Sequence, residues 1–211
     1  LYEVDRVRNG KSFSTRRVTA VQKGRTIFIM TASFQIAEEG FVHQFKMPSV
    51  PSPEDLPTDI ERMEKSLPRL TEEQRKTLCR ERPIELRRVE AIDFANPKRK
   101  SPVQHIWLRS KERLGNQYSE HQGFLAYASD MGLLSTSSLP HGMSWLNGLQ
   151  TASLDHSMWF HDSFRMDKWI LAVIESPTAS NSRAFNRGLM FSAEGALIAS
   201  VSQEGLMRVR K

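Results

Sequence analysis

The segment Tyr118-Ser-Glu-His-Gln-Gly-Phe-Leu-Ala-Tyr-Ala-Ser-Asp-Met-Gly-Leu-Leu134 has the residue spacing of a buried helix. Its apolar residues recur one, three and four positions apart, at Phe124, Leu125, Ala128, Met131 and Leu134. Most of the remaining chain alternates in polarity or is rich in β-branched residues, as strands are. One long helix among strands predicts an α+β fold in which the helix covers one face of an antiparallel sheet.

Strands are expected on both sides of this helix along the chain. Before it, they cover residues 84–91 and 104–110, joined by a basic loop flanked by proline. After it, they cover residues 149–158, 169–174, 183–191 and 196–205, with a turn at Ala193-Glu-Gly195. The segment 84–211 is therefore predicted to form one domain.

The N-terminal part predicts a smaller β-unit. Strands are expected over residues 1–8, 12–21 and 26–34, because Asn9-Gly10 and Lys23-Gly24 are strong turn signals. Beyond this unit the prolines cluster at Pro48, Pro51, Pro53, Pro57, Pro68 and Pro83. We interpret residues 47–83 as a Pro-rich linker with short helices over 57–66 and 70–80, which leaves residues 1–46 as the first domain.

The two ends of the chain resemble each other. Thr26-Ile-Phe-Ile-Met-Thr-Ala-Ser-Phe-Gln35 aligns with Ala196-Leu-Ile-Ala-Ser-Val-Ser-Gln203 at the glutamines. Coincidence between two β-rich segments is one explanation of this weak match, and two copies of one β-unit is the other. The sequence opens at Leu1 within a strand pattern, so we expect the first copy to lack the helix and the early strands of the second.

Composition limits the classes of function. In 211 residues, 30 Lys and Arg against 24 Asp and Glu give a net charge of +6, which favours anionic partners without naming one. The basic excess between Arg87 and Arg113 fits a solvated surface better than a nucleic-acid site, because few aromatic residues are interleaved with it. A single cysteine, Cys79, excludes an internal disulfide framework and a multi-cysteine zinc site. No apolar run is long enough to span a bilayer.

Few polar residues stand out as candidates for chemistry. The six histidines are scattered, and structural hydrogen bonding is the default interpretation of each. His156 and His161 are spaced so that they point to opposite sides of a strand, and metal ligation is therefore not expected. Asp130 lies in an apolar helix and Gln203 ends an apolar strand. An unpaired buried charge is costly, so Asp130 lies either at an edge of the core or among polar partners.

Several motifs narrow the interpretation. In the C-terminal part they are His121-Gln-Gly-Phe-Leu-Ala-Tyr-Ala-Ser-Asp130, Pro140-His-Gly142, Ser153-Leu-Asp-His-Ser-Met-Trp-Phe-His161, Glu175-Ser-Pro-Thr-Ala-Ser-Asn-Ser-Arg183 and Ala199-Ser-Val-Ser-Gln-Glu-Gly205. In the N-terminal part they are Gly10-Lys-Ser-Phe-Ser-Thr-Arg-Arg-Val18, Met30-Thr-Ala-Ser-Phe-Gln35 and Glu54-Asp-Leu-Pro57. Together they resemble the acyl-CoA thioesterase II family over essentially the whole chain. The resemblance implies a tandem double hotdog, in which curved antiparallel sheets wrap around a central helix and the first hotdog is incomplete at its N-terminus.

The resemblance also implies an activity and a catalytic trio. It places the family's functional residues on Asp130, Ser153 and Gln203, and it implies hydrolysis of fatty acyl-CoA to free fatty acid and CoA. Many relatives have threonine at the hydroxyl position, so Ser153 preserves the chemistry, and Ala184 replaces a glycine found in many of them. A water activated by Asp130 and held by Ser153 and Gln203 is sufficient, because thiolate leaves readily and neither metal nor cofactor is needed. Backbone N–H groups are expected to stabilise the oxyanion.

The contacts with substrate and the partners of the protein are further expectations. Arg183 or Arg187 is expected to meet the phosphates of CoA. Met158, Trp159 and Phe160 are expected to line an apolar acyl tunnel, although core packing explains them equally well. We expect an acyl-CoA substrate, no nucleic acid, no membrane span and a homo-oligomer, dimer or tetramer.

The expected compartment is the cytoplasm in a bacterium or the peroxisomal matrix in a eukaryote, and the end Arg208-Val-Arg-Lys211 is not a peroxisomal signal. The alternative function is a non-catalytic acyl-CoA-binding hotdog protein, in which the same pocket holds ligand and no water is activated.

Overall fold

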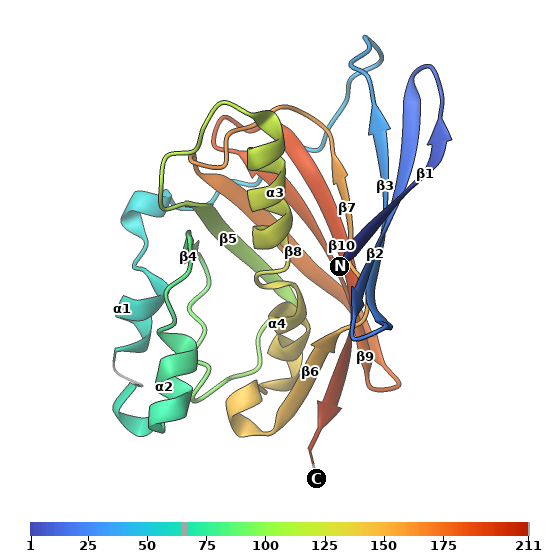
Figure 1. The fold of residues 1–211 in the computed structure, drawn as a ribbon. Helices are drawn as coiled ribbons and strands as arrows, with labels where there is room; N and C mark the ends of the chain where they lie inside the picture. Colours follow the sequence, from blue (N-terminus) through green and yellow to red (C-terminus); the bar gives the residue numbers. More distant parts are fainter. Residues whose placement is uncertain (65–66, 211) are drawn as a thin grey trace. The chain divides into compact units, whose positions relative to one another are not determined.

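The computed structural model describes residues 1–64 and 67–210. The chain forms two compact units, Leu1–His43 and Gln44–Lys211. Figure 1 shows the strands and helices of each unit.

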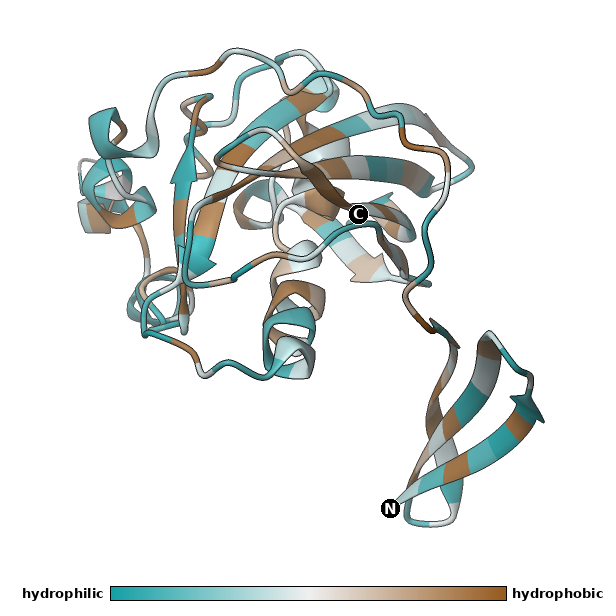
Figure 2. Cartoon of the chain, turned by 90° about the horizontal axis from the view of Figure 1, so that it is seen from above, coloured by the Kyte–Doolittle hydropathy of each residue, from teal (hydrophilic) through white to brown (hydrophobic). Residues whose placement is uncertain are grey.

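The N-terminal unit is a three-stranded antiparallel sheet in the order β1-β2-β3. Its strands are β1 (Tyr2–Asn9), β2 (Phe13–Gln22) and β3 (Arg25–Gln35), which confirms the predicted meander. Positive φ angles at Lys23 (51°) and Gly24 (72°) close the second hairpin as a primed turn does. Polar and apolar residues form alternating bands along these strands (Figure 2), and large apolar side chains of β3 are exposed, at Ile27, Phe28, Ile29, Met30 and Phe34.

The Pro-rich segment is short-helical, as predicted, and it packs against a sheet. It contains the 3₁₀ helices η1 (Pro53–Asp55) and η2 (Leu67–Arg69) and the helices α1 (Asp59–Met63) and α2 (Glu72–Leu78). Residues 65 and 66, predicted as the end of the first helix, lie outside the described residues. Capping boxes begin both α-helices, at Thr58 and Thr71.

The C-terminal unit contains a seven-stranded antiparallel sheet. Its order is β4-β5-β8-β9-β10-β6, and β7 also pairs with β10. The strands are β4 (Ile84–Arg88), β5 (Val103–Ser110), β6 (Leu149–Ser153), β7 (Ser157–Phe160), β8 (Ile170–Ser180), β9 (Arg183–Ser192) and β10 (Leu197–Val209). Both faces of β5 and of the first half of β8 are largely buried, and Ile170-Leu-Ala-Val-Ile174 accordingly forms a continuous apolar run.

Each face of this sheet has its own apolar cluster. On one face, Leu125 and Ala128 of the helix α3 (Tyr118–Ser129) pack on residues such as Ile106 and Ile174. On the other face, the cluster of Trp107, Trp169, Leu171 and Phe191 is covered by Met47, Val50 and Leu56 of the Pro-rich segment. Trp107 Nε1 donates to Pro51 O at 3.0 Å, and Trp169 Nε1 donates to Glu54 Oε1 at 2.9 Å. The Pro-rich segment therefore forms part of the packed domain.

The prediction of one continuous helix to Leu134 is wrong beyond Ser129. The chain breaks there and a second helix, α4 (Leu133–Ser138), follows, with 3₁₀ helices η3 (Leu139–His141) and η4 (Trp145–Asn147) after it. The break centres on Gly132, whose φ of 104° is rarely adopted by other residues. A Cβ at this position would also collide with Ile106 Cδ1 of β5 and approach Ile174 Cδ1 of β8 to 3.2 Å.

The prediction of one strand over residues 149–158 is also wrong, because the chain forms two strands, β6 and β7, along the same edge of β10. Ser153 pairs with Gly205 and Ser157 pairs with Ser202, so residues 154–156 bulge opposite Gln203 and Glu204. The Asp155 carboxylate accepts the Glu204 N–H at 2.8 Å, a contact that a strand backbone would otherwise make.

Replacing Gly132 by alanine is expected to lower the free energy of unfolding by about 1–3 kcal/mol, because the added methyl overpacks the helix break against β5. The matched control is Gly123→Ala in α3, where a Cβ meets nothing within 4 Å. That change is expected to raise stability by up to ~1 kcal/mol through helix propensity. Urea unfolding of the two variants measures the difference, and equal stabilities would contradict this account of the break.

Candidate active site

Gln203 lies at the centre of the candidate site. It is on β10, on the sheet face that packs on α3, and only 1% of its surface is exposed. Its Nε2 atom donates to Asp130 Oδ1 at 2.6 Å and to Ser153 Oγ at 3.2 Å. The structure thus brings together the three residues that the sequence singled out.

The bulge between β6 and β7 positions Ser153 and its neighbours. Besides the Asp155 contact, Leu154 N donates to Glu204 O at 3.0 Å, so backbone and side chain both fasten this loop to β10. Ser153 is the last residue of β6 and lies beside the Gln203 amide as a result. The loop Asp155-His156-Ser157 then directs one further side chain to the same amide.

That further side chain is His156, which sequence reasoning missed. Its Nδ1 lies 3.3 Å from Gln203 Nε2, and its Nε2 lies 2.8 Å from Ser129 Oγ. Its position in the Asp155-His-Ser157 motif, next to Ser153, was the available signal, but it was outweighed by the default interpretation of scattered histidines as structural. Only the bulge, which the sequence pattern does not reveal, brings His156 to Gln203.

The hydrogen bonds of Ser129 identify the tautomer of His156. Ser129 Oγ donates its single proton to Ala126 O at 2.8 Å, so it must accept from the ring. The proton of neutral His156 is therefore on Nε2, and Nδ1 is an acceptor facing the Gln203 N–H. This arrangement connects the last turn of α3 to β10 through one imidazole ring.

Asp130 is the C-cap residue of α3 and is exposed. The sequence left two interpretations open for this carboxylate, an edge position or a polar environment, and the structure combines them. The helix break at Gly132 ends α3 beside β10, where Asp130 accepts from Gln203. Ser153 and His156 are exposed too, so solvent reaches these three side chains. Gln203 is the buried member of the site.

The Gln203 amide has hydrogen-bonding capacity that the described residues do not use. Three acceptors lie within 3.3 Å of Nε2, which carries only two protons. Within residues 1–64 and 67–210, the buried Oε1 atom finds no hydrogen-bond donor. A buried carbonyl oxygen without a donor costs free energy, so this atom is suited to accept from a water or a substrate group.

Partial loss of hydration is the largest influence on the pKa of His156, although the residue keeps contact with solvent. The pKa of His156 is lowered, because loss of hydration outweighs the attraction of the Asp130 and Asp155 carboxylates for the imidazolium. The neutral ring is the form that accepts from Gln203. Protonation at Nδ1 would place a His156 N–H donor opposite the Gln203 N–H donor, so this hydrogen bond exists only while His156 is neutral.

The remaining candidate residues divide between the two faces of the sheet. Arg183 and Arg187 are on the outer face of β9, where Arg183 pairs with Glu204 at 3.0 Å and Arg187 with Glu175 at 2.5 Å. Neither arginine reaches the trio. Arg183 lines an open hollow of about 820 Å³ together with Arg208 and Arg210, and Arg187 does not.

The three predicted tunnel residues also alternate along β7. Met158 packs on the apolar cluster beneath α3, and Phe160 stacks on Phe164 with ring centroids 6.3 Å apart. Trp159 points to the other face and is 54% exposed. Met158 and Phe160 thus share the face of Gln203, and Trp159 does not.

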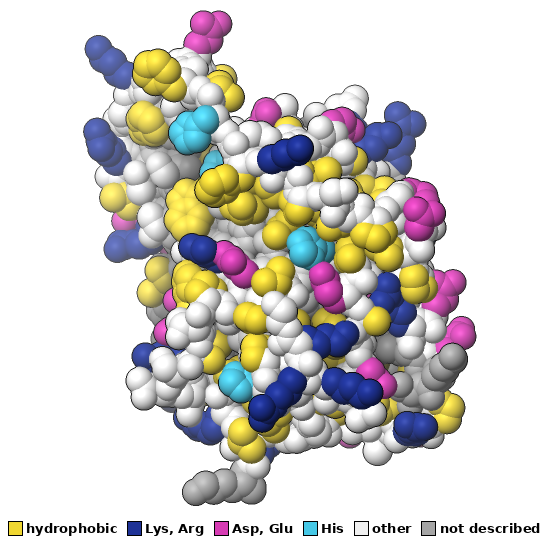
Figure 3. Space-filling view, turned by 180° about the vertical axis from the view of Figure 1, so that it is seen from behind, with side chains coloured by type: hydrophobic (Ala, Val, Ile, Leu, Met, Phe, Trp, Pro, Cys, Tyr) yellow, Lys and Arg dark blue, Asp and Glu magenta, His cyan; other side chains and the backbone are white. Residues whose placement is uncertain are grey.

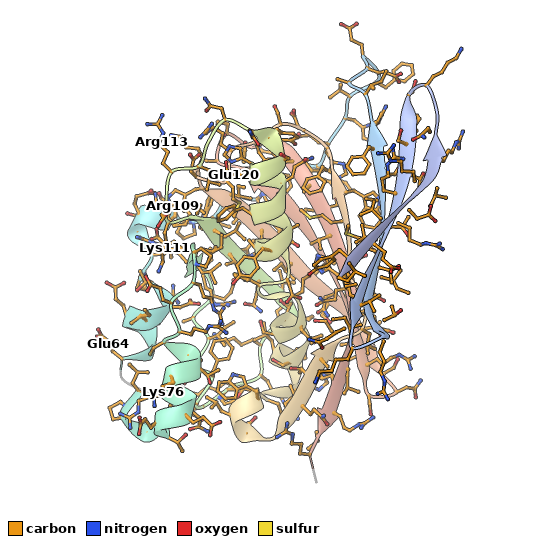
Figure 4. The ribbon with its side chains drawn as sticks, in the orientation of Figure 1. Glu64, Lys76, Arg109, Lys111, Arg113 and Glu120 are labelled. Carbon is orange, nitrogen blue, oxygen red and sulfur yellow. The ribbon has the colours of Figure 1, made fainter. Side chains whose placement is uncertain are left out.

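Part of the basic segment between Arg87 and Arg113 serves the fold. Arg109 lies over the Trp169 ring at 4.2 Å and pairs with Glu85 at 2.8 Å. Arg87 donates to Pro53 O and Leu56 O, at 2.8 and 3.0 Å. In Figure 4, Arg109 lies near the end of β5, and Lys111 and Arg113 lie in the loop that leads to α3.

The surface in Figure 3 carries charges of both signs. Basic and acidic side chains are interspersed there among apolar ones, unlike a continuous nucleic-acid surface.

Two features are absent from the described residues, 1–64 and 67–210. No group of three or more His, Cys, Asp or Glu side chains in them is arranged to hold a metal ion. None of the helices in the same ranges has the length and apolar character needed to cross a membrane.

Comparisons with known proteins identify the family of the chain. The family model "Acyl-CoA thioesterase" matches residues 75–206, and the model "Acyl-CoA thioesterase N-terminal domain" matches residues 1–35. Acyl-coenzyme A thioesterase 8 of Homo sapiens is 40% identical over 220 residues, which cover 100% of this chain and 68% of the human protein. The chain belongs to the acyl-CoA thioesterase family.

Solved structures agree with this membership and identify the fold. The acyl-CoA thioesterase II TesB2 from Mycobacterium marinum is 38% identical, with a TM-score of 0.79 over 100% of this chain and 74% of that one. A hot dog fold protein from Alicyclobacillus acidocaldarius, 18% identical, has a TM-score of 0.76 over 100% of this chain and 73% of its own. This acyl-CoA thioesterase family member therefore has a hotdog α+β structure, a curved antiparallel sheet around a central helix.

A titration tests the electrostatics of the site. We expect the pKa of His156 to lie below the usual value of about 6.5, and Asp130→Asn to lower it further by removing one attracting carboxylate. Two-dimensional ¹H–¹⁵N NMR of the imidazoles measures both, with His156→Gln used to assign the resonance. Glu120→Gln, in the first turn of α3 (Figure 4), is the matched charge control and is expected to change nothing. A pKa at or above 6.5 would show that burial does not dominate this ring.

Proposed function

We propose that this protein hydrolyses acyl-CoA thioesters to a carboxylic acid and free CoA, with Asp130, Ser153 and Gln203 as its catalytic residues. The observation that carries the proposal is the contact of the Gln203 amide with both the Asp130 carboxylate and the Ser153 hydroxyl. Membership of the acyl-CoA thioesterase family supports the same substrate class.

The proposed reaction uses one water molecule. Asp130 accepts a proton from this water, Ser153 and Gln203 hold it by hydrogen bonds, and its oxygen attacks the thioester carbonyl carbon. The resulting oxyanion is stabilised by backbone N–H groups. The C–S bond then breaks, and the departing thiolate takes the proton from Asp130, which restores the carboxylate and gives free CoA thiol.

His156 acts in this proposal by positioning the Gln203 amide. As the Nε2–H tautomer it accepts from Gln203 Nε2, which leaves Oε1 facing away from the Asp130 carboxylate. A flipped amide would place Oε1 within 2.6 Å of Asp130 Oδ1, where two acceptors repel each other. His156 and Asp130 therefore favour the same orientation of the amide.

The substrate contacts are proposed from the same geometry. Met158 and Phe160 share the helix-covered face with Gln203 and suit an acyl chain, whereas Trp159 does not line this path. Arg183 is the better candidate for the CoA phosphates, because its hollow also contains Arg208 and Arg210.

We also propose a tandem double hotdog. The two family models match one after the other, and each unit has a hairpin whose turn contains a positive-φ glycine, Gly24 and Gly195. Leu1–His43 then belongs to the first hotdog, and the second lies in Gln44–Lys211. A homo-oligomer of the full-length protein, dimer or tetramer, belongs to the same proposal.

Asp130→Asn and Gln203→Ala are expected to lower kcat by about 10²–10⁴, because each removes a group that activates or holds the water. Ser153→Thr keeps the hydroxyl and is expected to stay active. Ser153→Ala removes the hydroxyl and is expected to lose activity. Release of thiol from decanoyl-CoA by the full-length protein measures kcat, and circular dichroism checks the fold.

Glu120→Gln removes the same charge from the same helix and serves as the control. Unchanged turnover by Asp130→Asn would overturn the mechanism. Acyl-CoA binding without turnover by the wild-type protein would favour the non-catalytic alternative.

A further inference from the structure

Arg88 is a buried charge close to the helix break at Gly132. It ends β4, and its Nε atom donates to Asp59 Oδ2 of α1 at 3.2 Å. Its guanidinium also lies over the Phe94 ring, with Cζ 5.8 Å from the ring centroid. Apolar residues of similar size often stabilise a fold as well as a buried ion pair does, so this charge calls for a role besides packing.

The pattern of the sheet predicts apolar residues at this place. The next two side chains on the same face of each strand are apolar: Leu86 and Ile84 on β4, and Ile106 and Leu108 on β5. Arg88 pairs with Ile106 across the two strands, and Gln104 is two residues before Ile106 on the same face. Arg88 and Gln104 therefore form a polar pair where both strands would otherwise continue an apolar surface.

A chain of hydrogen bonds leads from Arg88 to the helix break. Arg88 Nη1 donates to Gln104 Oε1 at 2.7 Å, and Gln104 Nε2 donates to Thr136 Oγ1 at 2.9 Å. Thr136 Oγ1 donates in turn to Gly132 O at 2.8 Å. Because Gln104 and Thr136 are buried, bulk water does not compete for these hydrogen bonds.

The guanidinium fixes the direction of each donor in this chain. Arginine has donors and no acceptor, so it faces the Gln104 carbonyl oxygen and turns the amide N–H toward Thr136. The Thr136 oxygen accepts this N–H and directs its single proton to Gly132 O. Without the guanidinium the amide is free to flip, and the Thr136 hydroxyl then donates to Gln104 instead.

The Gly132 carbonyl ends the turn that carries Asp130. Residues 130–132 join α3 to α4. The Gly132 oxygen accepts from Thr136 N and Ser135 Oγ, both at 3.0 Å, in addition to the Thr136 hydroxyl. Three donors thus hold one end of a three-residue turn, and a shift of this carbonyl moves Asp130 with it.

We propose that Arg88 is a positioning residue for the reaction, which holds the turn through Gln104 and Thr136 and so sets the place of the Asp130 carboxylate. This inference rests on the proposed function. Arg88 acts through the chain and not on the reacting atoms. Its effect on rate follows from geometry, because a misplacement of about 1 Å costs about 10²-fold in rate.

Gln104→Glu separates positioning from stability. The new carboxylate fills the same space and pairs with Arg88, but it has no N–H for Thr136, whose hydroxyl then donates to it instead of to Gly132. We expect the full-length variant to stay folded by circular dichroism and to lose about tenfold in kcat for decanoyl-CoA at an unchanged KM. Arg88→Met is expected to lower kcat in the same way, and Arg88→Lys, which keeps a donor, to recover part of the loss.

The pKa of His156 reports the place of Asp130 without any turnover. The Asp130 carboxylate raises this pKa, so a displaced carboxylate raises it less. Thr136→Val removes the hydroxyl and changes no charge. In ¹H–¹⁵N NMR spectra we expect it to lower the pKa of His156 part of the way to the value in Asp130→Asn.

Ser137→Ala is the matched control for Thr136→Val. It removes another buried hydroxyl of α4, which donates to Leu134 O and lies outside the chain, and it is expected to change neither kcat nor the pKa of His156. Unchanged kcat in Gln104→Glu, or equal effects of Thr136→Val and Ser137→Ala, would overturn the inference. Absence of turnover in the wild-type protein would instead overturn the proposed function, and the pKa comparison would still test the place of Asp130.

Discussion

The hydrogen bond from Gln203 Nε2 to Asp130 Oδ1, at 2.6 Å, joins the end of α3 to the middle of β10. It forms only if the helix ends at Asp130 and the sheet lies close beneath it. Gly132 meets both conditions, because its positive φ ends the helical path and its missing Cβ lets the chain approach Ile106 and Ile174. The position of the site thus depends on one glycine two residues after the carboxylate.

The second constraint is the bulge at residues 154–156. The Asp155 carboxylate accepts the Glu204 N–H in place of a backbone carbonyl. The pairing along β10 therefore continues from β6 to β7 although residues 154–156 form no regular strand. The extra residues bring both Ser153 and His156 to the Gln203 amide. A site of four side chains from α3, β6, the bulge and β10 is then held by backbone geometry, and each side chain has a partner that fixes its direction.

The sequence predicted the strands, the helix and the trio but not the breaks between elements. The pattern of apolar residues locates β5 and β9 closely, but it ends β8 at residue 174 and β10 at residue 205, short of Ser180 and Val209. The break at Gly132 and the bulge depend on contacts with residues far along the chain, Ile106 and Glu204, which no local pattern contains. His156 escaped notice for the same reason, because its importance comes from its contact with Gln203.

Neighbouring residues of β10 serve different purposes on the two faces of the sheet. Gln203 points inward to Asp130 and Ser153, while the Glu204 side chain points outward to Arg183 and its backbone N–H is held by Asp155. Arg183 therefore contacts the residue whose backbone anchors the bulge, although it does not touch the site itself. Two effects of altering the outer face can then be distinguished. Loss of the proposed contact of Arg183 with CoA would change substrate binding, whereas displacement of Glu204 would shift the bulge and with it the water that Ser153 is proposed to hold.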